Sequence, residues 1–488
     1  MEAFSDMKTP AYVLDPSAIR RQIDRMVSAD QGQTEADRQT RDYYSGNAHT
    51  LVWVDRQGVD ESADSLLSWL HLVGEIGLSE GAFNVAAIER DLVRMRSLDF
   101  DEGDNQASKV AARLEYQLTR ACMRYCIGQR FGFVNPDHLL NNMDAERTDT
   151  AGRVIKYRGL FDIKMDHPSA HYASDVLAKV RKDSLAPYLR KIQPQNYFYG
   201  LMKSKLSQAD STLDRQRIMV NMERSRWRLH QPIDENVKRI VVNVPAYHLY
   251  AYNGSETLDM RVVCGARTTK TPLLSSFIEY MEVNPKWVIP MSIVENEVAR
   301  RAGDSAYFAR NRYGIYDRAT NKQMPVGSVS QQMLLSGKYR ISQEGGAGNS
   351  LGRIVFRFKN KFSVFLHDTS NPGAFQRTAR SLSHGCVRVS KPFELAEFVL
   401  GDADEWLLDR IRIAMGKTAE TERGLEYVQT HPDVSERNKL IGYVPVSSRV
   451  PLYIIYYTLW PDESGMMQKW PDIYGYDAAI WNKLKAYL

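Results

Sequence analysis

The stretch KRIVVNVPAYHLYAYNGSETLDMRVVCG, residues 238–265, marks the change from helical to strand patterning along the chain. Apolar residues alternate with other residues in it, as on strands with one buried face. The dipeptide Asn253-Gly254 separates two such runs, which is a signal for a type I′ hairpin. We therefore expect a β domain that begins near residue 236. The alternating apolar residues are Ile240, Val242, Val244, Leu258, Met260 and Val262.

Helical patterning dominates the preceding part, from about residue 62 to residue 230. Apolar residues recur there at spacings of three and four, the period of helices with one buried face. Asn84 is the expected N-cap of one of these helices. No group of catalytic residue types gathers in this half. The apolar stripes are Leu66, Leu67, Leu70 and Val73; Val85, Ile88, Leu92 and Met95; and Val110, Leu114, Leu118, Ala121, Cys122 and Tyr125.

Strand patterning continues beyond the opening stretch, and one long segment interrupts it. Residues 277–283, 354–358 and 362–366 alternate as further strands. Residues 292–346 instead combine a charged helix-like piece with a stretch rich in Gly, Asn and Tyr. An insertion of this length in a compact domain is typical of a lid over a functional site, or else of a mobile surface excursion. The sequence leaves both interpretations open.

Composition bounds the class of protein. The chain has 488 residues, of which 43% are hydrophobic and 25% charged, the balance of a globular protein of two or three domains. Its formal net charge of +5 comes without any Lys/Arg-rich block, which argues against nucleic-acid binding. No run approaches the ~20 apolar residues of a membrane span, and the first residues lack the apolar core of a signal peptide.

The four cysteines are too sparse and irregular for a disulfide framework or a paired-CxxC zinc site. Cys122 and Cys126 lie one helical turn apart on an apolar stripe, so we expect buried thiols. Cys264 shares a strand face with alternating apolar residues, so it is expected in the core as well. Cys386 remains as the candidate for chemistry.

Cys386 stands in the segment SHGCVRVS, where a loop meets a short strand. A catalytic cysteine needs a base or a positive charge that generates the thiolate. Two histidines could serve, namely His384 in the same segment and His367 at the end of an upstream strand. Gly385 allows close approach of the backbone, whose amides can form an oxyanion hole. These residue types together indicate an acyl-transfer site.

Two structural interpretations of Cys386 stay open beside the nucleophile. A cysteine with two histidines could belong to a zinc site, but zinc needs further ligands, and Asp368 is the only adjacent candidate. A cysteine in a glycine-containing turn could also be inert.

Residues 365–401, FLHDTSNPGAFQRTARSLSHGCVRVSKPFELAEFVLG, resemble the active-site signature of the YkuD-type L,D-transpeptidases, a His-x-Thr followed after a loop by Ser-His-Gly-Cys-x-Arg. The chain also resembles the large branch of that family, which has an N-terminal scaffold domain and a capped catalytic domain. The stretches that carry this wider resemblance are VVNVPAYHLYAYNG, RVVCGARTTKTPLLS, VNPKWVIPMSI, NSLGRIVFRF, VPLYIIYYTLWPDESG, DIYGYD and NMERSRWR.

The resemblance implies an α+β fold, with an N-terminal α-helical scaffold domain, a mixed β-sandwich catalytic domain and an inserted cap. We expect an N-terminal extension over residues 1–34, the helical scaffold and lead-in helix over 35–232, and the catalytic domain over 233–424. The cap would occupy about residues 292–346. Residues 425–488 would pack on both domains.

The resemblance also implies roles for particular residues. Cys386 would be the nucleophile, His367 the general base, and His384 a second ring that supports the oxyanion or the base. The amides of Gly385 and Cys386 would form the oxyanion hole, while Arg388 would order the site or bind a stem-peptide carboxylate. No metal and no cofactor are expected. Further supporting residues would be Ser383, Asp368 and Thr369, and candidate substrate contacts Trp287, Tyr307, Tyr313 and Arg353.

The chain departs from the family pattern in two places. Asp368 follows His367 where many members have glycine, and a positive φ at that position would be strained for Asp. The segment between Tyr199 and Arg217 is too short for the small peptidoglycan-binding domain that many large members insert there. Substrate capture would then depend on the cleft, the cap or a partner.

The function implied by the resemblance is L,D-transpeptidation, in which D-Ala leaves a tetrapeptide stem and a second stem's amine closes a 3-3 cross-link. Peptidoglycan stem peptides would be donor and acceptor, and carbapenems covalent inhibitors. The same thioester could instead be hydrolysed by an L,D-carboxypeptidase, and a non-catalytic wall-binding scaffold is a further alternative. We expect a monomer in the periplasm or cell envelope, whose export signal or anchor is absent from this chain.

Overall fold

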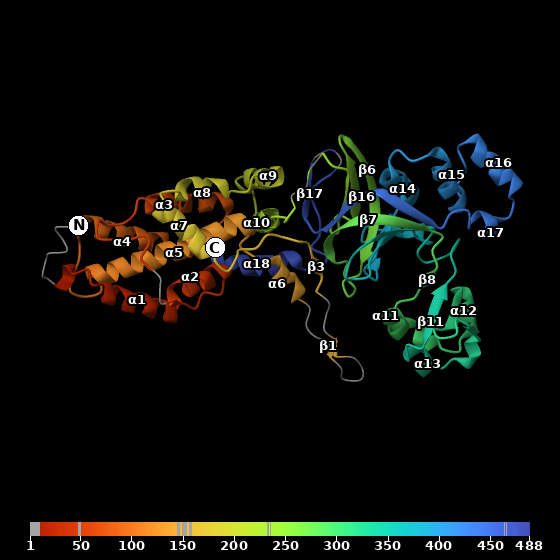
Figure 1. The fold of residues 1–488 in the computed structure, drawn as a ribbon, viewed down its shortest axis with the longest axis horizontal. Coiled ribbons are helices and arrows are strands. Elements are labelled where there is room, and N and C mark those ends of the chain that lie inside the picture. The colour runs from red at the N-terminus through yellow and green to blue at the C-terminus, as the bar shows by residue number, and fades with distance from the viewer. Residues whose placement is uncertain are drawn as a thin grey trace.

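The protein is elongated, with a helical domain at one end and a β domain at the other (Figure 1). A smaller lobe lies beside the β domain. The predicted fold class, a helical scaffold followed by a mixed β domain, is confirmed. This computed structural model describes residues 10–46, 50–143, 147–148, 154–155, 159–231, 234, 236–462, 464 and 466–488.

The helical domain is built around α5 (Ala107–Phe131), whose residues are buried along almost the whole helix. The thiols of Cys122 and Cys126 lie in its buried face, with their sulfurs 3.8 Å apart, as the apolar stripe predicts. The neighbours of α5 include α1 (Pro16–Ala29), α2 (Glu35–Ser45), α3 (Ser62–Leu70), α4 (Val85–Ser97) and α7 (Tyr172–Arg181).

Asn84 occupies the N-cap position of α4, as predicted, but its side chain makes no capping hydrogen bond. Its backbone is left-handed, with φ 55°, because it closes the preceding short helix η4 (Glu80–Phe83). Asn tolerates this conformation better than most residues. Its side-chain nitrogen donates instead to Gln117 Oε1 of α5, at 2.8 Å.

The β domain is a mixed sheet that curves around one apolar core and closes on itself, because β12 pairs with both β13 and β7. Cys264 faces this core, as expected. The order along the sheet is β12 (Ile354–Phe358), β13 (Leu366–His367), β15 (Val387–Val389), β6 (Glu256–Gly265), β5 (His248–Asn253), β4 (Arg239–Asn243), β16 (Tyr443–Ile455), β7 (Leu273–Val283) and β3 (Phe161–Asp162), with β14 (Ser381–Ser383) beside β6.

The hairpin expected at Asn253-Gly254 is present, but its turn lies one residue later. Asn253 is the last residue of β5 and pairs with Glu256 of β6, so Gly254 and Ser255 form the turn. Only Gly254 has a positive φ, of 59°. The turn is therefore not type I′, which needs positive φ at both central residues.

The strand expected over residues 362–366 is reduced to Leu366–His367. The Asn360 side chain holds the preceding residues in a loop, because its Oδ1 accepts hydrogen bonds from the amides of Phe362 and Val364 at 3.0 and 3.2 Å. The position of His367 at the strand end is nevertheless as predicted. Leu366 points into the core, and His367 to the opposite face.

Residues 292–346 fold as most of a separate lobe, which we call the cap. Its sheet also takes in β8 (Trp287–Val288), and it has an apolar core of its own. The segment is thus a packed unit and not a simple loop. The other elements are β9 (Tyr313–Asp317), β10 (Gln323–Met324), β11 (Tyr339–Gln343), α11 (Met291–Ile293), α12 (Ser305–Arg310) and α13 (Gln331–Leu335).

The last part of the chain joins the two domains. Strand β16 completes the large sheet, and α18 (Tyr476–Leu484) then packs against α10 (Thr212–Arg226). Arg224 of α10 pairs with Asp477 of α18 at 2.7 Å. The amide of Ser79 donates to the carbonyl of Tyr487 at 2.9 Å, so the chain end returns to the helical domain.

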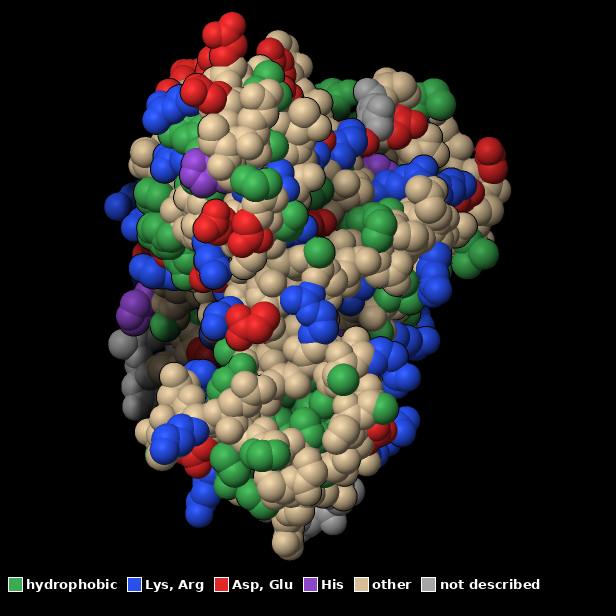
Figure 2. All heavy atoms as spheres, turned by 90° about the vertical axis from the view of Figure 1, so that its right-hand side faces the viewer, with side chains coloured by type: hydrophobic (Ala, Val, Ile, Leu, Met, Phe, Trp, Pro, Cys, Tyr) green, Lys and Arg blue, Asp and Glu red, His purple; other side chains and the backbone are tan. Residues whose placement is uncertain are grey.

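Charge is mixed over the surface at the end of the molecule that holds the β domain. Figure 2 shows basic and acidic side chains interspersed there, with Lys and Arg more frequent along one edge. This distribution fits the small net charge of +5. Within the described residues, no helix is both long and apolar enough to cross a membrane.

Candidate active site

Cys386 lies in the short loop between β14 and β15, and side-chain hydroxyls fix the shape of that loop. Ser383 Oγ donates to the Cys386 carbonyl at 2.5 Å and accepts from the Gly385 amide at 3.2 Å. Thr271 Oγ1 donates to the Gly385 carbonyl at 2.9 Å. The Gly385 amide, expected in an oxyanion hole, therefore points to Ser383 in this structure.

Gly385 has a φ of 113°, which an L side chain rarely adopts. A Cβ at this position would make ordinary contacts, the nearest being Lys270 O at 3.5 Å. The cost of a substitution therefore comes from the backbone, at about 1–3 kcal/mol. We expect Gly385→Ala to distort the loop beside Cys386. Acylation of the Cys386 thiol by a carbapenem should become at least tenfold slower, while the melting temperature should fall by only a few degrees.

Stopped-flow acylation and thermal melting would test this, with Gly373→Ala as the matched control, since Gly373 has an ordinary φ and its nearest contact is a side-chain oxygen at 3.5 Å. Equal acylation rates for Gly385→Ala and the wild type would contradict it.

His367 is buried, with 4% of its surface exposed, at the end of β13. Burial and the positive charge of Arg388 lower its pKa to about 3, while main-chain groups of Asp368 and Leu351 act in the opposite direction. Its Nδ1 is buried and has no hydrogen-bond partner. The imidazole is therefore uncharged at neutral pH and has a ring nitrogen available.

The Cys386 thiol is uncharged as well. Burial raises its pKa to about 11, against the effects of a main-chain hydrogen bond from Phe365 and the charges of Arg357 and Arg388. Strands β13 and β15 are parallel neighbours, with His367 opposite Arg388. Among the described residues no hydrogen bond joins Cys386 to a histidine. The resting pair is thus a neutral imidazole at the end of β13 and a thiol in the loop just before the adjacent strand β15.

Two arginines supply positive charge beside this pair. Burial lowers the pKa of Arg388, and its Nε is buried without a partner. Arg357 pairs with Glu282 at 2.8 Å and lies over the Phe365 ring at 4.5 Å. Because both charges favour a thiolate and disfavour an imidazolium, they assist ionisation of the sulfur once a proton acceptor is in place.

His384 connects the site to the cap. Its Nε2 lies 2.7 Å from Glu297 Oε1, and about half of each side chain is exposed (50% and 52%). Glu297 belongs to the π-helical segment η5 (Val294–Val298). No motif singles out Glu297 in the sequence, where the only signal is the charged piece VENEVARRAG that opens the cap.

Asp368 and Thr369 support the backbone around His367. The Asp368 carboxylate accepts a hydrogen bond from the Arg353 amide at 2.8 Å, and Asp368 is not among the residues with positive φ. The departure from glycine therefore causes no strain there. Thr369 is buried and accepts from the Asn371 amide at 3.1 Å.

The four candidate substrate contacts fall into two groups. Trp287, Tyr307 and Tyr313 come together in the cap, where ring centroids of Trp287 and Tyr313 lie 6.3 Å apart and those of Tyr307 and Tyr313 6.0 Å apart. Arg353 instead donates to Asn284 and Asn438 at 3.1 and 2.8 Å, which anchors loops of the catalytic domain.

Comparison with known proteins agrees with this architecture. Residues 237–418 match the YkuD family, described as an L,D-transpeptidase catalytic domain, and residues 38–206 match the family described as a Scaffold domain. A Haemophilus influenzae protein named "Putative L,D-transpeptidase" is 28% identical over 320 residues. That match covers 64% of this chain and 60% of the relative's length. Two successive parts of the chain are thus similar to known domain families, first a Scaffold domain and then a YkuD-type L,D-transpeptidase catalytic domain.

Proposed function

We propose that the protein is a peptidoglycan L,D-transpeptidase that forms 3-3 cross-links through a thioester on Cys386. The observation that carries the proposal is the placement of His367 at the end of β13 and of Cys386 just before the parallel neighbour β15, both uncharged and both within the electrostatic influence of Arg388. The family of the catalytic domain supports the same reaction class. Peptidoglycan lies outside the cytoplasmic membrane, so we place the protein in the periplasm or cell envelope.

In the first half-reaction, His367 accepts the thiol proton while Cys386 attacks the carbonyl of the third stem residue. A sulfur–carbon bond forms, the amide bond to the terminal D-Ala breaks, and His367 passes the proton to the departing amine. The amides of Gly385 and Cys386 stabilise the oxyanion after Gly385 turns away from Ser383. His384 supports the oxyanion or the base.

In the second half-reaction, the amine of another stem attacks the thioester. A new amide bond forms, the sulfur–carbon bond breaks, and the amine proton passes through His367 to the sulfur. Arg388 and Arg357 stabilise the sulfur while it is charged. Free Cys386 thiol and a cross-linked dimer result.

The cap favours attack on the thioester by an amine over attack by water. Glu297 holds it against His384, and Trp287, Tyr307 and Tyr313 give it an aromatic cluster for the stem. A closed cap excludes water from the thioester, which favours transfer over hydrolysis.

The test is product analysis with purified disaccharide tetrapeptide. We expect mass spectrometry to detect dimers joined through third residues, together with one D-Ala per acylation. Tripeptide without dimers would favour the L,D-carboxypeptidase. Sacculus binding that Cys386→Ala leaves unchanged, with no turnover in the wild type, would favour a wall-binding scaffold.

A further inference from the structure

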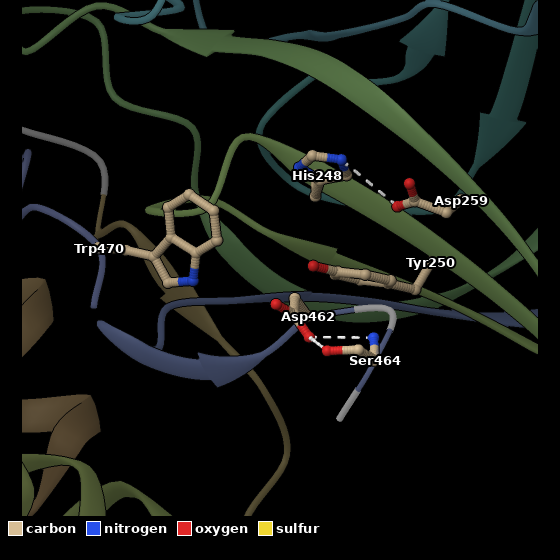
Figure 3. A pocket seen from close by; sticks show the side chains of 6 residues that line it. All are labelled: His248, Tyr250, Asp259, Asp462, Ser464 and Trp470. Atoms are coloured by element: carbon tan, nitrogen blue, oxygen red, sulfur yellow. Dashed lines mark hydrogen bonds and ion pairs between the residues drawn. The ribbon is translucent and has the colours of Figure 1, made fainter. Parts of the chain in front are cut away.

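A pocket of about 370 Å³ opens on the outer face of the catalytic sheet (Figure 3). Its volume falls within the ~300–1,000 Å³ usual for small-molecule sites. Strands β5 and β6 form one wall, and the segment around the hairpin β17 (Leu459–Pro461) and β18 (Met467–Lys469) forms the other. The lining residues are His248, Tyr250, Asp259, Asp462, Ser464 and Trp470, which we call the hairpin pocket.

We propose that the hairpin pocket binds an N-acetylated sugar ring of the glycan strand that carries the donor stem. This inference rests on the proposed function, since it concerns another part of the same substrate. A pyranose ring combines apolar C–H faces with a rim of hydroxyls, and its N-acetyl group adds a carbonyl acceptor. The pocket has a matching set of groups.

The aromatic part of the pocket is Trp470 opposite a rigid ladder of rings. His248 and Tyr250 stack at 5.7 Å, and Tyr250 and Tyr252 at 6.2 Å, so the faces of Tyr250 are covered. The ladder therefore presents ring edges, and the Tyr250 hydroxyl points toward Trp470 (Figure 3). The indole is left as the large apolar surface for a sugar ring.

Trp470 also supplies a hydrogen-bond donor that the protein does not use. Its Nε1 is buried and has no hydrogen-bond partner. A buried donor without an acceptor costs about 1–3 kcal/mol. A sugar hydroxyl or the carbonyl of an N-acetyl group in the pocket would satisfy it.

The charges of the pocket favour an uncharged ligand. Its described lining contains no Lys or Arg, so phosphate or a free stem carboxylate has no counter-ion. Asp462 already accepts hydrogen bonds from Ser464, Met466 and Gln468 in its own turn. Asp259 pairs with His248 at 3.4 Å. Neither carboxylate is therefore a free partner for an ammonium group.

The pocket lies on the same sheet face as His367. His367 of β13 lies opposite Arg388 of β15, and Arg388 lies opposite Val263 of β6. Two residues before Val263, Arg261 has the same orientation on β6 and lies opposite His248 of β5. Strands β13 and β5 are three strand spacings apart, on the order of 14 Å. Three extended stem residues span roughly 10 Å, and the lactyl ether between stem and sugar extends the reach. The direct path crosses β6 at Val263, which Ala374 and Phe375 of η8 (Pro372–Gln376) cover. A stem acylated on Cys386 therefore has to pass around η8 to place its own sugar at this pocket.

Binding can be tested with an uncharged sugar that has no stem. We expect N,N′-diacetylchitobiose to bind the full chain with a millimolar Kd in calorimetry or saturation-transfer NMR. Trp470→Ala should weaken binding at least tenfold, and Trp470→Phe severalfold, because Phe keeps a ring but loses the donor. Trp406→Ala is the matched control, since Trp406 lies on α15 (Glu405–Ala414), away from the pocket. Melting curves check that each variant is folded.

The second readout is the KM of the wild type and of Trp470→Ala for two donors, free tetrapeptide and disaccharide tetrapeptide. We expect Trp470→Ala to raise KM for disaccharide tetrapeptide and to leave KM for free tetrapeptide unchanged. The proposal is overturned if chitobiose does not bind, if Trp470→Ala binds it as well as the wild type, or if lysine methyl ester binds in its place. If the proposed transpeptidase function is wrong, the wild type converts neither donor, whether or not chitobiose binds. That outcome is distinct from failure of the sugar-binding proposal.

Discussion

Cys386→Ala is expected to abolish acylation by a carbapenem. The wild type should gain the mass of one carbapenem per chain, since two arginines favour the ionised form of the thiol and His367 ends the strand next to β15. The variant has no sulfur at this position, and it should remain at its own mass after hours of incubation. Intact-protein mass spectrometry measures both. Turnover of tetrapeptide should fall at least ~10⁴-fold in the variant, the scale of losing a covalent nucleophile.

The matched control is Cys264→Ala. Cys264 is on β6, and burial raises the pKa of its thiol to about 12. That variant should acquire the same adduct as the wild type, after a check that it is folded. An adduct that persists in Cys386→Ala would exclude Cys386 as the nucleophile.

His367→Asn is expected to slow acylation about 10²–10⁴-fold, the usual contribution of a general base. The pH dependence gives the sharper distinction. Because the pKa of His367 is lowered to about 3 and that of Cys386 raised to about 11, the thiol and the neutral base coexist between these values. The wild-type rate should therefore be nearly flat from about pH 6 to pH 9.

Without the base, reaction depends on the small fraction of thiolate. That fraction rises about tenfold per pH unit below the thiol pKa, so the rate of His367→Asn should rise with a slope near one. Stopped-flow acylation across this pH range measures both profiles, with His138→Asn on α6 (Pro136–Asn141) as control. A wild-type profile of slope one would mean that His367 does not act as the base.

Local patterns were sufficient to predict which face of an element several key side chains occupy. Alternation placed Leu366 in the core and His367 on the other face, and it assigned Cys264 to the core. The apolar stripe of α5 accounted for Cys122 and Cys126. In each case the pattern reports which side of an element is buried, and burial is what a period of 2 or 3.6 encodes.

The predictions failed where a side chain reaches beyond its own element. Asn84 is the N-cap residue of α4, but its side chain bonds to α5 and not to the helix start, and Asn360 holds part of an expected strand in a loop. Glu297 contacts His384 across the interface between cap and catalytic domain. No local spacing encodes such a contact, because it depends on how distant segments pack.

The position of β16 has a consequence for how the protein is made. This strand lies between β4 and β7, with Leu452 opposite Ile240 and Ile454 opposite Leu274. A fragment that ends at residue 418, where the catalytic-domain match stops, would lack a central strand and leave two open sheet edges. During synthesis, β4 is translated about 200 residues before β16, and translation proceeds at roughly 5–20 residues per second. The catalytic sheet therefore closes late, only after nearly all of the sequence in hand has been translated.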